Sequence, residues 1–186
     1  DRETADFWQT VAGLPISLGS IPALCDQVST ALAPADAAIH QQVQQQSVVQ
    51  VDETSWREEN RRSWLWTVAT AAATCFRIQR RRNRAAFAAV LAPDFGGLLV
   101  SDRYGVYRRI PAHRRQICWA HLCRDLKGCL ERTTAARTWA QAMLEQVDAL
   151  FVYWRWYRAD QIERLHLQVL TAPHRQQIQA LLQVPP

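Results

Sequence analysis

Lysine is almost missing from this chain, since Lys127 is the single lysine among 22 basic residues and every other one is arginine. The planar guanidinium group of arginine matches phosphate oxygens in a bidentate manner. The arginine excess and the formal net charge of +5 therefore favour an acidic polymer as a partner. A GC-rich genome would also favour arginine over lysine, and the sequence leaves both explanations open.

Glycine, proline and long apolar runs are also scarce. With 6 glycines, 8 prolines and 48% hydrophobic residues, the chain is expected to bury a core rather than remain disordered. No apolar run approaches the roughly 20 residues that cross a bilayer, so no membrane span is expected. The polar start without methionine predicts no signal peptide. Five cysteines, an odd number, predict a reducing cytoplasm.

The first 47 residues are expected to be a helical lead-in segment. Ser20 is a suitable N-cap, and apolar residues follow at helical spacing at Ile21, Leu24, Val28 and Leu32. Pro34 either interrupts that helix or begins the next one.

Short runs rich in valine, aromatic and β-branched residues then predict strands over residues 48–54, 64–70, 75–79, 97–101 and 116–121. The polar residues 57–62 predict a hairpin loop, whereas residues 71–73 fit either strand or helix. Asn83 is a plausible cap for a short helix over residues 85–91, a helical turn is expected around residues 104–110, and helices follow from Leu122.

This order predicts an α/β protein with a mixed sheet: three antiparallel strands, then alternating helices and strands, with flanking N- and C-terminal helices. Such an order is typical of the ribonuclease H-like fold, although several α/β folds begin in the same way. The expected domains are the lead-in at 1–47, a partial catalytic core at 48–132 and a helical insertion or appendage at 133–186.

Asp52 and Asp102 are the main candidate site residues, because each follows a short apolar strand. In the ribonuclease H-like order those two strands are adjacent and parallel, which would bring both carboxylates into one site for a hard divalent cation. The alternative is that each aspartate only caps a turn. Glu53 is expected on the opposite face of its strand, as a salt-bridge partner rather than a metal ligand.

Several motifs resemble the insertion-sequence-66 family of transposases. They are Asp52-Glu53-Thr54-Ser55-Trp56, Trp64-Leu65-Trp66, Val100-Ser101-Asp102-Arg103-Tyr104, Cys118-Trp119-Ala120-His121-Leu122 and Arg124-Asp125, in a resemblance running from about Gly13 to Arg132. The resemblance implies a ribonuclease H-like DDE enzyme that cuts and joins DNA with two divalent metals, Mg²⁺ or Mn²⁺. It implies that Asp52 and Asp102 are the first two catalytic and metal-binding carboxylates, and that transposon ends and target DNA are the partners.

The third acid of that family, a glutamate in an asparagine-rich motif, is not found in the sequence. The chain is therefore expected to stop before it and to be weakly active or inactive; robust activity would instead point to Glu131 or Glu145 as the third acid. The alternative is a non-catalytic remnant that binds DNA or oligomerises. The aromatic stretch at residues 151–157 is too apolar for full exposure, and it is a candidate surface for a homo-oligomer.

The basic residues near the site are candidate DNA contacts, or else solvated surface charges. They are Arg80, Arg81, Arg82, Arg84 and Arg103. Tyr104 either contacts the DNA backbone or packs at the start of a helix. Cys118, His121 and Cys123 match no standard zinc spacing, so buried cysteines are favoured over a metal site or a Cys-His nucleophile.

Overall fold

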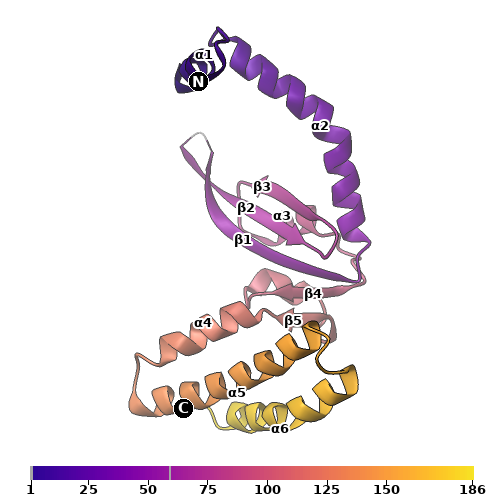
Figure 1. The fold of residues 1–186 in the computed structure, drawn as a ribbon, viewed down its shortest axis with the longest axis vertical. Helices are drawn as coiled ribbons and strands as arrows, with labels where there is room; N and C mark the ends of the chain where they lie inside the picture. Colours follow the sequence, from indigo (N-terminus) through magenta and orange to yellow (C-terminus); the bar gives the residue numbers. More distant parts are fainter. Residues whose placement is uncertain (1, 59) are drawn as a thin grey trace. The chain divides into compact units, whose positions relative to one another are not determined.

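The computed structural model describes residues 2–58 and 60–186 and divides into two compact units, Asp1–Gln116 and Ile117–Pro186. The described residues form an α/β structure with six α-helices, two short 3₁₀ turns and one five-stranded sheet (Figure 1). The expected α/β class with a mixed sheet is therefore confirmed.

The sheet has the strand order β3-β2-β1-β4-β5. Its members are β1 (Val48–Glu58), β2 (Arg61–Ala69), β3 (Thr74–Gln79), β4 (Leu98–Ser101) and β5 (Arg115–Ile117). The first three strands pair antiparallel in sequence order, while β1 and β4 pair in parallel. The first strand thus lies between its hairpin partner and β4, as the sequence predicted.

The β1–β2 hairpin is longer and tighter than the sequence indicated. Residues 57–62 were expected to be a loop, yet the ladder continues to the pair Glu58↔Arg61. Asn60 adopts a left-handed backbone with φ of 59°, a conformation that asparagine tolerates better than most residues. Glu59, part of the expected loop, lies outside the described residues. Residues 71–73 connect β2 to β3 and are neither strand nor helix.

The expected fifth strand over residues 116–121 is wrong beyond Ile117. Cys118 is the extended N-cap of helix α4 (Trp119–Cys129), and the amide of Leu122 donates to the carbonyl of Cys118 at 3.1 Å. Short apolar runs fit a strand and a buried helical turn equally well, and in the structure the residues from Trp119 onward are helical. Helix therefore begins three residues before Leu122.

The lead-in segment contains α1 (Arg2–Ala12) and α2 (Ser20–Gln44). The expected break at Pro34 is wrong, because α2 continues through that residue. Proline removes a single backbone donor, and here that loss is tolerated within a long helix. Ser20 is the first helical residue rather than the cap; its amide donates to the hydroxyl of Ser17 at 3.1 Å.

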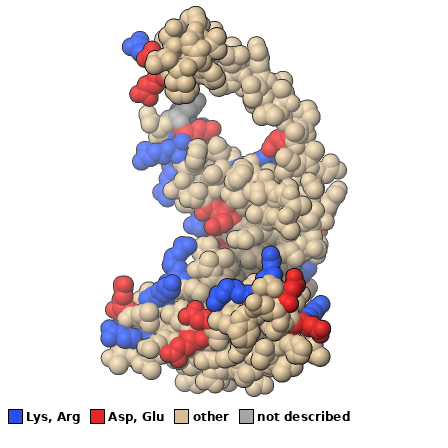
Figure 2. All heavy atoms as spheres, in the orientation of Figure 1, with Lys and Arg blue, Asp and Glu red and all other residues tan. Residues whose placement is uncertain are grey.

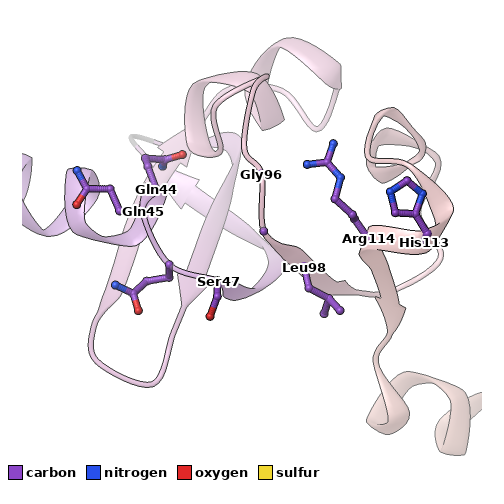
Figure 3. Close-up of a pocket in the computed structure, with 9 residues that line it drawn as sticks. Gln44, Gln45, Ser47, Gly96, Leu98, His113 and Arg114 are labelled. Atoms are coloured by element: carbon purple, nitrogen blue, oxygen red, sulfur yellow. The ribbon is translucent and has the colours of Figure 1, made fainter.

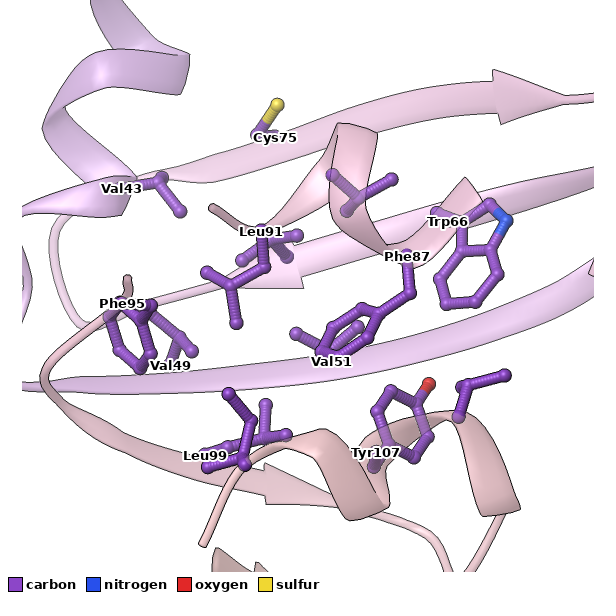
Figure 4. Packing of buried hydrophobic residues seen from close by; sticks show 14 of the residues in the cluster. Val43, Val49, Val51, Trp66, Cys75, Phe87, Leu91, Phe95, Leu99 and Tyr107 are labelled. Atoms are coloured by element: carbon purple, nitrogen blue, oxygen red, sulfur yellow. The ribbon is translucent and has the colours of Figure 1, made fainter. Parts of the chain in front are cut away.

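The core of the first unit lies on one face of the sheet (Figure 4). Val49 and Val51 of β1 and Leu99 of β4 are fully or almost fully buried there. Helix α3 (Arg84–Val90) and the 3₁₀ turn η1 (Gly105–Arg109) cover them with aromatic rings, those of Phe87 and Tyr107. The predicted cap is confirmed, since the side chain of Asn83 accepts from the amide of Ala86 at 3.0 Å.

The second unit consists of α4, α5 (Thr134–Arg158) and α6 (Arg164–Gln183). Leu126, Ala140 and Met143 form its buried centre, and the indole N–H of Trp139 donates to the carbonyl of Leu181 at 2.9 Å. The aromatic stretch at residues 151–157 is helical, and Trp154 is still 43% exposed. Its role in oligomerisation stays a prediction.

Candidate functional site

The parallel pairing of β1 with β4 positions the two candidate aspartates. The pairs Val48↔Leu98, Val49↔Leu99 and Gln50↔Val100 fix the register. The last pair lies two residues before Asp52 and two before Asp102. Adjacent paired strands lie about 4.8 Å apart, so the register would bring the two aspartates opposite each other if it continued. Because side chains alternate along a strand, and Val49 and Val51 are buried, Asp52 lies on the face of β1 opposite the core.

Both carboxylates are held by nearby backbone amides. Asp52 Oδ1 accepts from the amide of Glu53 at 3.0 Å, and Asp102 Oδ1 accepts from the amide of Tyr104 at 2.8 Å. Asp52 is exposed, whereas the side chain of Asp102 is 22% exposed. The predicted strand end at Asp52 is wrong, because β1 continues to Glu58, whereas Asp102 directly follows β4. The two carboxylates offer the hard oxygen ligands that Mg²⁺ and Mn²⁺ prefer.

A second acidic side chain of β1 lies on the core face. The carboxylate of Glu53 is 1% exposed and forms an ion pair with Arg82 at 2.6 Å. The hydroxyl of Tyr107 donates to its other oxygen. Arg82 also lies 3.8 Å from Asp102 Oδ2, so it links the buried glutamate to the candidate site. The prediction that Glu53 is a salt-bridge partner is confirmed.

Two aromatic rings complete this network, which we call the Glu53 cluster: Glu53, Arg82, Tyr104, Tyr107 and Trp64. The guanidinium carbon of Arg82 is 4.0 Å from the ring centroid of Tyr104 and 5.1 Å from that of Trp64. The hydroxyl of Tyr104 donates to the carbonyl of Arg82 at 2.7 Å. Tyr104 therefore packs in the first unit, one of its two predicted roles, and fixes the segment that carries Arg82.

Burial sets the protonation behaviour of the Glu53 cluster. Desolvation raises the pKa of Glu53 above its usual value, although the bonds from Tyr107 and Arg82 act in the opposite direction. Burial, then the hydrogen bond to Glu53, raises the pKa of Tyr107, and the charges of Asp102 and Asp52 add to the effect. Burial would lower the pKa of Arg82, but its bond to Glu53 and the nearby negative charge raise it overall.

The sequence missed the roles of Arg82 and Tyr107 in this cluster. Strand alternation indicated where Glu53 points, but no local pattern linked it to a tyrosine 54 residues further along the chain. Arg82 was predicted as a DNA contact, which stays a prediction. In the structure the guanidinium group of Arg82 forms an ion pair with Glu53.

The other predicted arginines lie at or near the surface. Arg81, Arg84 and Arg103 are exposed, while Arg80 pairs with Glu58 at 3.1 Å and donates to the buried hydroxyl of Ser63 at 3.2 Å. Their contacts with DNA stay predictions.

The cysteine and histidine motif lies on helix α4 rather than on a strand. Cys118 and His121 are three residues apart there, so they do not lie on opposite faces as a strand would require. Cys118 and Cys123 are half-buried free thiols, and burial raises the pKa of Cys123. Across residues 2–58 and 60–186, no group of three or more histidine, cysteine or acidic side chains is arranged to hold a metal.

A polar hollow of about 480 Å³ lies at the other end of β1 and β4 (Figure 3). Gln44, Ser47, Leu98, His113 and Arg114 are among its lining residues. The two strands begin here, whereas Asp52 lies further along β1 and Asp102 directly follows β4, and none of the lining residues is acidic. This hollow is therefore not part of the carboxylate site.

Comparison with known proteins agrees with the family that the sequence motifs indicate. The family model for the transposase IS66 family matches residues 2–184. The chain belongs to this transposase family. The match extends beyond the resemblance from Gly13 to Arg132 and includes all three helices of the second unit. A search of curated proteins found no match. In the part of the chain that the structure describes, no helix combines the length and apolar character needed to span a bilayer.

Proposed function

We propose that this IS66-family chain cleaves and joins DNA strands at Asp52 and Asp102, with Mg²⁺ or Mn²⁺ as the cofactor. The observation that supports the proposal is the parallel β1–β4 register, whose last pair, Gln50↔Val100, lies two residues before each aspartate. Family membership supports DNA as the substrate. The strand order β3-β2-β1-β4-β5 supports a ribonuclease H-like core, which we include in the proposal.

The donor set fits a hard divalent cation, because both candidate ligands are carboxylates with their Oδ1 atoms oriented by backbone amides. Two such ions held by these carboxylates would activate water or a 3′-hydroxyl and stabilise the leaving oxygen of the phosphodiester. Asp52 would contact the ions from β1, and Asp102 from the end of β4. Low activity, because the third carboxylate is missing, stays a prediction of the sequence; Glu131 and Glu145 are the candidates for that carboxylate if the chain proves active.

Manganese binding tests the carboxylate pair without requiring activity. Mn²⁺ affinity, measured by electron paramagnetic resonance, should fall at least tenfold in Asp52→Asn and in Asp102→Asn. Asp94→Asn is the matched control, because it removes one exposed carboxylate from the loop before β4 and should bind as the parent does. Equal affinity in all four proteins would overturn the metal site.

Plasmid cleavage with Mg²⁺ or Mn²⁺ then tests the reaction itself. Cleavage that disappears in Asp52→Asn and Asp102→Asn, but not in Asp94→Asn, supports the enzyme. DNA binding that survives in every variant, with no cleavage even by the parent chain, would favour the non-catalytic alternative.

A further inference from the structure

The β1–β2 hairpin extends past the other strands of the sheet. The β2–β3 register ends at Trp64↔Gln79, and the β1–β4 register ends at Gln50↔Val100. The three pairs nearest the turn are Trp56↔Ser63, Arg57↔Arg62 and Glu58↔Arg61. Among the described residues these pairs have no third strand on either side, and Figure 1 shows the hairpin running outward. We call residues 56–58 and 61–63 the ribbon.

Arginines are concentrated on the ribbon. Arg57 and Arg62 are direct cross-strand partners, an arrangement in which like charges destabilise a ladder. Arg80 reaches the ribbon through its ion pair with Glu58. Figure 2 shows blue side chains gathered on this hairpin. The guanidinium carbon of Arg62 lies 5.0 Å from the ring centroid of Trp64. Two like-charged cross-strand partners become favourable when they share an anion such as a phosphate.

An exposed tryptophan accompanies these charges. Trp56 is 43% exposed, and strand alternation puts it on the same face of β1 as Asp52. Four residues separate the two, which is about 14 Å along a strand. The same alternation puts Arg57 and Arg62 on the opposite face of the hairpin, and all three residues line one hollow of about 380 Å³ together with Ser55 and Asn60.

We propose that the ribbon is a DNA-binding arm next to the carboxylate site. Arg57 and Arg62 hold a backbone phosphate, and Trp56 stacks on a base or sugar of the same DNA. This mixture of exposed aromatic and arginine side chains is the combination that binds nucleic acid strands through stacking and charge. The position of the arm relative to the scissile phosphate rests on the proposed function at Asp52 and Asp102.

DNA affinity at several salt concentrations tests the arm. Fluorescence anisotropy would use a labelled 25-base-pair duplex and one of its strands, with Arg57→Gln/Arg62→Gln, Trp56→Ala and Trp56→Phe. We expect the double arginine variant to lose about tenfold or more in affinity and to reduce the slope of log K against log salt by up to about 2. Arg155→Gln/Arg158→Gln, which removes the same charge from α5, is the control and should change little.

The tryptophan variants separate stacking from charge. Trp56→Ala should lose about 5- to 100-fold in affinity for the single strand with an unchanged salt slope, and Trp56→Phe should restore much of it. Wild-type affinity in the double arginine variant and in Trp56→Ala overturns the arm. A dimer that dissociates in Trp56→Ala by light scattering, with DNA affinity unchanged, makes the ribbon a protein interface instead and also overturns it.

The melting temperature of Arg57→Gln separates a DNA-binding role of the ribbon from a structural one. Removing one of two facing charges should leave the melting temperature of Arg57→Gln unchanged or higher. A lower melting temperature with unchanged DNA affinity would show a structural role and refute the proposal. The two proposals fail separately. Metal affinity in Asp52→Asn tests only the carboxylate site, and DNA affinity in the ribbon variants tests only the arm.

Discussion

Removing one hydroxyl from the core should measure how strongly the Glu53 cluster stabilises the first unit. In Tyr107→Phe the ring contacts remain, including the edge-on contact with Phe87 at a centroid distance of 5.0 Å. The carboxylate of Glu53 loses a donor while it is 1% exposed, so water cannot replace the lost bond. Hydrogen bonds to charged groups contribute about 1.5–3 kcal/mol, so we expect a loss of about 2 kcal/mol at pH 8.

The expected loss depends on pH. The bond from Tyr107 favours the ionised form of Glu53 and lowers its pKa, even though burial raises that pKa overall. At pH 4 the glutamate carries a proton, and the lost bond is then a neutral one, worth about 1 kcal/mol. The difference in unfolding free energy between the parent and Tyr107→Phe should therefore increase from pH 4 to pH 8.

Urea unfolding followed by circular dichroism measures both values. Tyr153→Phe on α5 is the matched control, because that ring contacts Trp156 and His174 in the second unit. The control should lose less than about 0.5 kcal/mol, the usual range for surface changes. If Tyr107→Phe costs no more than the control at pH 8, or loses the same free energy at both pH values, the reasoning is refuted.

Two further changes probe the same strands. Burial holds the pKa of Glu53 above its usual value of 4.5, so its contribution to stability is complete below about pH 4.5 and decreases as the pH rises through the folded-state pKa. The parent should therefore lose stability relative to Glu53→Gln between pH 4.5 and pH 8 in urea unfolding, and a constant difference would contradict the shifted pKa. Gly97→Ala would bring a Cβ within 2.7 Å of the carbonyl oxygen of Ser47, a backbone atom that cannot move aside. We expect a loss of about 1–3 kcal/mol, as for other overpacked sites. Gly96→Ala, with no described heavy atom within 4 Å of its added Cβ, is the control, and equal stability of the two variants would argue against the close approach.

Most of the secondary structure of the first unit follows from local patterns in the sequence. Short apolar runs rich in valine and leucine identified β1 and β4, because such runs are typical of buried strands. Asn83 was recognisable as a cap because its side chain bonds only three residues away. The motifs around Asp52 and Asp102 likewise indicated the family, because each motif is a short continuous stretch of the chain.

The helix boundaries near Cys118 and Pro34 and the partners of Glu53 depend on residues far apart in the chain, so the tertiary structure was needed to identify them. The apolar residues around Cys118 fit strand or helix until the surrounding chain selected α4, and Pro34 did not end α2 despite its missing amide. The link between Glu53, Arg82 and Tyr107 joins positions up to 54 residues apart, and no local periodicity encodes it. Local propensity acts over a few residues, whereas burial of a charge requires partners that only the folded chain brings together.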